Sequence, residues 1–245
     1  MEILKKTPWR KHPRIPAGLR IYVVGDVHGR ADALKDVMSR IDADRAARRI
    51  TRTVQVFLGD YVDRGPASSE VLDRLIERSL TDEVLLLKGN HEAFLLDFFD
   101  NPAMLEVWRQ NGGLPTLTSY GLKPSLNPSS AEQQELAREF ARVVPPAHRK
   151  LLAELPCSFK CGDYFFVHAG VRPGVALKDQ KEEDLLWIRE DFLLHERDFE
   201  KIIVHGHTPV AEPEIHSNRI NLDIGAYATG KLACMVLEAA SIGFI

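Results

Sequence analysis

The chain has 245 residues, of which 44% are apolar and 27% are charged, and its formal net charge is −3. A chain of this length can bury a sizeable core without disulfides. The small negative charge argues against a nucleic-acid-binding domain, which usually carries a basic stripe. No apolar run reaches the length of a membrane-spanning helix. Cys157, Cys161 and Cys234 form an odd, sparse set that favours reduced thiols over a disulfide framework, so we expect a cytoplasmic protein.

The first ninety residues alternate between short apolar runs and amphipathic helices. After a basic N-terminal tail over residues 1–18, the runs Ile21–Val24 and Val54–Leu58 predict two strands. Apolar residues at helical spacing follow both strands, at Leu34, Val37, Met38 and Ile41 and again at Val71, Leu72, Leu75 and Ile76. A third run, Val84–Leu87, predicts another strand. Strands that are apolar on both faces and alternate with helices indicate a layered α/β fold.

Residues 93–155 differ in character, because prolines and glycine turns interrupt their helical spacing. We interpret this segment as a helical insertion or cap within a single domain that spans residues 1–245. Beyond it, apolar runs predict strands at Tyr164–Val167, Ile202–Val204, Arg219–Leu222 and Leu232–Leu237. Between the first two of these, Leu185–Arg189 has the pattern of an amphipathic helix.

A polar segment with adjacent glycines follows five of the predicted strands. These segments are Gly25-Asp26-Val27-His28-Gly29, Gly59–Gly65, Gly89-Asn90-His91-Glu92, His168-Ala169-Gly170 and His205-Gly206-His207-Thr208. Because the carboxyl ends of neighbouring strands meet at one edge of an α/β sheet, we expect these side chains to converge there. Carboxylate, imidazole and amide groups are suited to Mn²⁺, Fe or Zn²⁺.

Each segment alone also has an ordinary structural interpretation. A histidine at a strand end is more often a hydrogen-bonded core residue than a ligand. The segment Gly59–Gly65 by itself is typical of a surface turn with an Asp–Arg ion pair. Five such segments at five predicted strand ends favour a shared metal site over five separate structural roles.

In this order, the segments resemble the motifs of the calcineurin-like metallophosphoesterases, and most closely those of the bacterial branch of the phosphoprotein phosphatase family. The resemblance runs from Ile21 to about Leu237. It implies a four-layer α/β/β/α sandwich with the metal site at the carboxyl ends of the strands.

The resemblance also implies a role for individual residues. Asp26 and His28 would bind the first of two divalent ions, Asp60 would bridge both ions, and the second ion would be bound by Asn90, His168 and His207. Arg64, Asn90 and Arg189 would contact the phosphate, and His91 would be the general acid, oriented by Asp63. Two ions that share a hydroxide lower its pKa toward neutrality, and arginine forks match phosphate oxygens. Mn²⁺ is the ion that we expect first, with Fe or Zn²⁺ as alternatives.

The activity implied by this resemblance is hydrolysis of phosphomonoesters, with phosphoserine or phosphothreonine in proteins as the main substrate hypothesis. The alternative is a diadenosine tetraphosphate hydrolase, a group that usually has Asp after Gly-Asn-His, whereas this chain has Glu92. Lys88 stands where eukaryotic protein phosphatases have arginine. A non-catalytic binding module of the same fold should have lost part of the ligand set, and a nuclease should be more basic. The partners expected are therefore phosphoesters and not nucleic acids.

Overall fold

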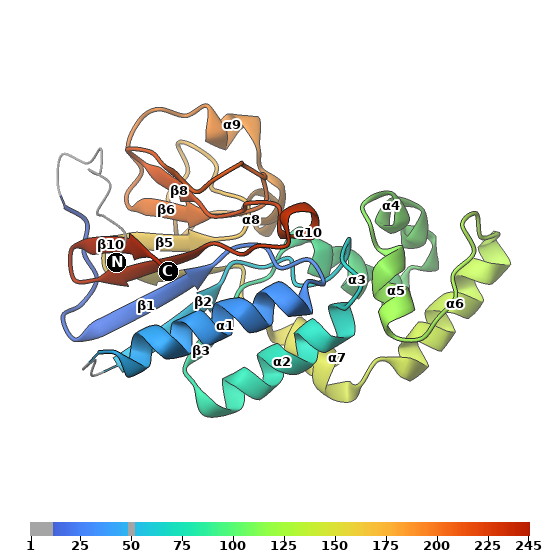
Figure 1. The fold of residues 1–245 in the computed structure, drawn as a ribbon. Helices are drawn as coiled ribbons and strands as arrows, with labels where there is room; N and C mark the ends of the chain where they lie inside the picture. Colours follow the sequence, from blue (N-terminus) through green and yellow to red (C-terminus); the bar gives the residue numbers. More distant parts are fainter. Residues whose placement is uncertain (1–11, 49–51) are drawn as a thin grey trace.

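The computed structural model describes residues 12–48 and 52–245 and contains two five-stranded sheets stacked against each other (Figure 1). Residues 1–11 of the predicted tail lie outside the described residues. The first sheet has the order β10-β9-β1-β2-β3. Its strands are β1 (Leu19–Val24), β2 (Arg52–Phe57), β3 (Val84–Leu86), β9 (Cys234–Glu238) and β10 (Ser241–Phe244). Strands β1, β2 and β3 are parallel, whereas β9 is antiparallel to both β1 and β10.

The second sheet has the order β4-β5-β6-β8-β7. Its strands are β4 (Ser158–Cys161), β5 (Tyr164–Val167), β6 (Ile202–His205), β7 (Glu214–Ile215) and β8 (Arg219–Asn221). The three central strands β5, β6 and β8 are parallel, and an antiparallel strand closes each edge. Each sheet therefore contains three adjacent parallel strands, whose carboxyl ends lie on the same side of that sheet.

The alternation of side chains along β1 explains the layers. Ile21 and Val23 point into a core between the two sheets, while Tyr22 and Val24 point into a second core under the helices of the first sheet. Successive residues of a strand face opposite sides of the sheet, so an unbroken apolar run buries both faces. A third core lies on the outer face of the second sheet, beneath Leu185 and other helical residues. The protein is therefore a four-layer α/β/β/α sandwich, as the family resemblance implied.

The helices of the sandwich are α1 (Ala31–Ala46), α2 (Ser68–Thr81), α8 (Glu182–Trp187), α9 (Glu190–Leu193) and α10 (Ala226–Thr229). Residues 90–154 are helical, and α4, α5 and α6 lie to one side of the sheets (Figure 1). This part comprises α3 (Asn90–Asp100), the 3₁₀ turn Pro102–Met104, α4 (Leu105–Gln110), α5 (Leu114–Ser119), α6 (Ser130–Val143) and α7 (Pro146–Glu154). Among the described residues, no helix is long and apolar enough to cross a membrane.

Candidate metal centre

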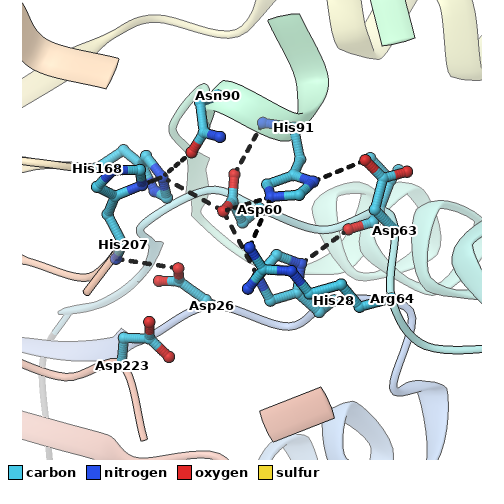
Figure 2. A network of polar contacts seen from close by, with 12 residues as sticks. Asp26, His28, Asp60, Asp63, Arg64, Asn90, His91, His168, His207 and Asp223 are labelled. Atoms are coloured by element: carbon cyan, nitrogen blue, oxygen red, sulfur yellow. Dashed lines mark hydrogen bonds and ion pairs between the residues drawn. The ribbon is translucent and has the colours of Figure 1, made fainter. Parts of the chain in front are cut away.

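The predicted site residues converge at the carboxyl ends of the parallel strands. Figure 2 shows nine of them in one network of polar contacts, together with a tenth residue, Asp223. They come from segments as far apart as β1 and β6, and the members are Asp26, His28, Asp60, Asp63, Arg64, Asn90, His91, His168 and His207. Nearly all of them are buried. A chain that buries so many ionisable groups together requires compensating charge within the cluster.

The backbone at the site is strained. Among the described residues, six non-glycine residues have positive φ, and all but Ala239 belong to this network: His28, Asp60, Asp63, Arg64 and His207. Non-glycine residues adopt this conformation rarely, and it persists where the surrounding structure over-determines it. The glycines beside them allow close approach, since a Cβ on Gly206 would overlap Asp26 Oδ1 and one on Gly89 would overlap Asp60 Oδ1.

Asp60 lies at the middle of the cluster. Its Oδ2 is 3.5 Å from Nε2 of His28 and 3.4 Å from Nε2 of His168. Two groups of residues have donor atoms close enough to hold an ion, and Asp60 belongs to both: one contains His28 and His91, and the other contains His168 and His207. This shared position agrees with the bridging role that we predict for Asp60.

Backbone carbonyls fix the orientation of two of the histidines. The Nδ1 of His28 lies 3.0 Å from the carbonyl of Val62, and Nδ1 of His168 lies 3.0 Å from the carbonyl of Leu58. A proton on Nδ1 donated to each carbonyl leaves Nε2 free as a metal ligand, an arrangement common around bound metals. Asn90 Oδ1 lies 2.9 Å from Nε2 of His168, so the amide oxygen points to the same place.

Two donor atoms of the predicted ligand set have no hydrogen-bond partner. Asp26 Oδ2 accepts the backbone N–H of His207 at 3.0 Å, but Asp26 Oδ1 and His207 Nε2 are buried without a partner among the described residues. A buried polar atom left unsatisfied costs about 1–3 kcal/mol. Divalent cations would satisfy both atoms, so the residues present fit a two-ion site with oxygen and nitrogen ligands.

The electrostatics of the cluster also favour the binding of additional positive charge. Burial and the neighbouring Asp223 raise the pKa of Asp26 well above its usual value. Burial acts against the ionised form of Asp60 as well, but His168 and His91 hold the pKa of Asp60 well below its usual value. Burial lowers the pKa of His168, yet Asp60 and Asp26 outweigh it and raise that pKa to about 9. Protons and metal ions compete for such groups, because a ligand binds metal in its deprotonated form.

We therefore expect metal binding to stabilise the fold. Adding Mn²⁺ at about 100 times its Kd to chelator-treated protein should contribute about 2.7 kcal/mol, which corresponds to a rise of roughly 5–10 °C in Tm for a chain of this size. The measurement is thermal unfolding with and without Mn²⁺, with K⁺ at equal ionic strength as the control. An unchanged Tm at saturating Mn²⁺ would argue against ion binding at these residues.

His91 and Asp63 form a buried pair next to Asp60. Asp63 Oδ2 lies 2.7 Å from Nδ1 of His91 and also accepts the indole N–H of Trp108 at 2.7 Å, while Thr116 donates to Asp63 Oδ1 at 2.6 Å. Burial lowers the pKa of His91, but Asp60 and Asp63 outweigh it and raise that pKa above its usual value. Both Trp108 and Thr116 belong to the helical insertion, so this insertion helps to hold the carboxylate that orients His91.

The two predicted phosphate-binding arginines occupy different positions. Arg64 lies within the cluster, with Nη1 3.0 Å from Nε2 of His28 and Nη2 3.1 Å from Nε2 of His91. Arg189 lies at its edge, exposed to solvent, where Nη1 donates to Thr208 Oγ1 at 3.3 Å. The helix predicted through Arg189 ends at Trp187 instead, so Arg189 lies in the turn before α9.

Glu92 has a structural role, which limits its value as an indicator of the substrate. Its carboxylate accepts the backbone N–H groups of Gly89, Asp60, Tyr61 and Val62 at 2.8–3.3 Å. It therefore ties the loop after β2 to the start of α3. Because both of its oxygens are engaged by the backbone, Glu92 is a weak indicator of the substrate.

Asp223 is a buried acid of the site that was not predicted. It follows Leu222, the first residue after the short strand β8, and its Oδ1 accepts the backbone N–H of Gly225 at 2.9 Å. The sequence feature that could have identified Asp223 is an acidic residue directly after a predicted strand, as at Asp26. His205, by contrast, lies outside the cluster: it is buried against Phe192, and its Nδ1 lies 3.0 Å from the carbonyl oxygen of Gly206.

Comparisons with known proteins agree on one family for this chain. The family model for calcineurin-like phosphoesterases matches residues 19–235. A relative from Oceanobacillus iheyensis, named bis(5'-nucleosyl)-tetraphosphatase PrpE [asymmetrical], is 24% identical over 234 residues that cover 87% of each chain. The relative of the same name from Anoxybacillus flavithermus is 26% identical over 196 residues, covering 73% of each chain.

A solved structure described as a putative diadenosine tetraphosphatase has the same fold, with a TM-score of 0.61, 18% identity and coverage of 92% of each chain. At this identity the likeness shows the fold alone. The family model covers most of the sequence and includes all nine predicted residues of the network around Asp60. The chain therefore belongs to the calcineurin-like phosphoesterase family and is a metallophosphoesterase.

Proposed function

We propose that this protein is a dinucleoside polyphosphate hydrolase that uses two divalent ions held by the cluster around Asp60. The observation that carries the proposal is the similarity to relatives named bis(5'-nucleosyl)-tetraphosphatase, which extends over 87% of both chains in the first of them. The similarity therefore extends over most of the length of both chains.

The alternative substrate class, phosphoserine or phosphothreonine in proteins, has less support. The sequence argument for it depended on Glu92, whose carboxylate accepts backbone N–H groups of its own loop. A solved structure described as a cold-active protein-tyrosine phosphatase of a psychrophile Shewanella species has a TM-score of 0.56 at 15% identity, covering 99% of this chain and 86% of that one. That likeness concerns the fold and does not favour a phosphoprotein substrate.

In this proposal, residues of the cluster have the following roles in hydrolysis. Asp26, His28, Asp60, Asn90, His168 and His207 would hold the ions. A pair of divalent ions held there would supply the activation of a water for attack on phosphorus and the screening of the phosphate charge. Arg64 binds the non-bridging oxygens with its planar fork. His91 donates a proton from Nε2 to the leaving oxygen, and Asp63 holds the other side of its ring.

A substrate comparison tests this proposal. Purified protein with Mn²⁺ should cleave diadenosine tetraphosphate at least about 100-fold more efficiently, by kcat/KM, than a phosphoserine or phosphothreonine peptide. Unequal nucleotide products would indicate asymmetric cleavage of the four-phosphate bridge. The opposite preference would favour a protein phosphatase. If diadenosine tetraphosphate remained intact with a metal-replete sample, the proposal would be wrong.

A further inference from the structure

A chain of edge-to-face ring contacts passes through the candidate site. The ring of Tyr227 lies 5.6 Å from His28, His28 lies 4.7 Å from His91, His91 lies 6.0 Å from Phe94, and Phe94 lies 4.9 Å from Trp187. The interplanar angles of these contacts range from 72° to 85°. The central histidines are buried, so the chain connects two outer rings through the catalytic centre.

Only the two ends of this chain reach the solvent. Trp187 is 38% exposed and Tyr227 is 41% exposed, whereas Phe94 is 8% exposed. Among the described residues, the other exposed large hydrophobic side chains are aliphatic, including Leu80 and Leu194. Within residues 12–48 and 52–245, the two exposed large aromatic rings therefore lie at the two ends of this chain of ring contacts.

The backbone holds each of these rings in place. Trp187 is the last residue of α8, and the carbonyl of Leu185 in that helix accepts the backbone N–H of Ala169 at the end of β5. Tyr227 lies in α10, whose cap residue Gly225 donates its N–H to Asp223. Figure 1 shows α3, α8 and α10 near one another at the end of the sheets. Rigid support of this kind lowers the entropy cost of binding a flat ligand.

The charges next to the rings indicate what kind of ligand they would bind. The guanidinium of Arg64 lies 4.8 Å from the centroid of the Tyr227 ring, and Arg64 also lies beside His28 and His91. On the other side, Arg189 follows Trp187 by two residues. Tyr227 thus lies against a cation suited to phosphate, and Trp187 lies two residues along the chain from another. The matching ligand has a flat group and a phosphate chain, and a dinucleoside polyphosphate has a base at each end of such a chain.

We propose that Trp187 and Tyr227 are the two base-stacking platforms of the site, one for each nucleobase of a dinucleoside polyphosphate. This inference rests on the proposed function. Stacking on an aromatic side chain tolerates any base, because every base has a π-face. The platforms would therefore select for two bases joined by phosphates without discriminating strongly between adenine and guanine.

Substitution of each ring tests the platforms. Trp187→Ala and Tyr227→Ala should each lower kcat/KM for diadenosine tetraphosphate about tenfold, mainly through KM, as expected for the loss of one stacked base. Trp187→Phe and Tyr227→Phe should recover most of this loss, because they retain a ring. Leu80→Ala, which removes an 81% exposed apolar side chain on α2, is the control and should match the wild type.

A matched pair of inhibitors separates base binding from phosphate binding. AMP and ribose 5-phosphate differ by the base alone, so the alanine variants should raise the inhibition constant of AMP about tenfold relative to that of ribose 5-phosphate. Wild-type cleavage of diadenosine tetraphosphate with an unchanged inhibition ratio in both variants would overturn the platforms and leave the proposed function standing. Failure of the wild type to cleave this substrate would overturn both.

Discussion

Replacing Asp60 with asparagine should lower turnover at least about 10³-fold on every phosphoester substrate, a loss equivalent to about 4 kcal/mol of transition-state stabilisation. The substitution preserves the size of the side chain but removes the negative charge next to His28 and His168. Asp60 belongs to both groups of candidate ligands, so its loss would weaken both ion sites together. The ions supply several kcal/mol of charge stabilisation in such sites.

The measurement is kcat with saturating Mn²⁺, accompanied by the metal content of each variant. Asp36→Asn is the matched control, because Asp36 is an exposed acid that pairs with Arg40 on the surface of α1. Surface ion pairs contribute little, and this variant should retain wild-type turnover. If Asp60→Asn bound two ions and turned over normally, Asp60 would not be the bridging ligand.

Replacing His91 with asparagine should produce a loss that depends on the leaving group. We expect a decrease of about 10²-fold on phenyl phosphate and less than about tenfold on p-nitrophenyl phosphate. The nitrophenolate departs readily without a proton, whereas phenolate requires one. His91 is placed to give it, since Asp63 engages Nδ1 at 2.7 Å and Nε2 faces Asp60 and Arg64.

His12→Asn, at an exposed histidine far from the motifs, is the control and should show equal activity on both substrates. Parallel measurement of metal content separates proton donation from ion binding, because His91 also lies within reach of the candidate ion site that includes His28. Equal losses on phenyl phosphate and p-nitrophenyl phosphate would show that His91 does not act as the general acid.

The sandwich could be predicted because its central strands are strongly patterned. Ile21–Val24 and Tyr164–Val167 are continuous apolar runs, and the structure places strands there. The apolar runs did not predict β4, β7 and β10, which are antiparallel edge strands. β7 has only two residues, and edge strands lack the two-sided burial that makes central strands apolar.

The candidate site was predictable to a similar extent and for a related reason. Each ligand that the sequence suggested follows a strand of a parallel set, and parallel strands deliver their carboxyl ends to one edge. Asp223 follows the predicted strand Arg219–Leu222 in the same way, so the same signal was present there.

The contacts of the helical insertion with the site could not be predicted. Trp108 and Thr116 lie 45 and 53 residues from Asp63, yet both hydrogen-bond to its carboxylate. No local pattern links a tryptophan on one helix to an acid on a distant loop. The same holds for the contact of Trp187 with Phe94, which joins α8 to α3.

The amino-acid sequence by itself determined the layered fold, the family and the set of groups available for metal binding, since periodicity and strand-end motifs are local properties of the chain. Tertiary structure alone decided which atoms meet around Asp60 and that Glu92 is occupied by its own loop. It also decided which aromatic rings remain in solvent beside the centre. These features depend on distances between segments remote in sequence, and packing of the whole domain sets those distances.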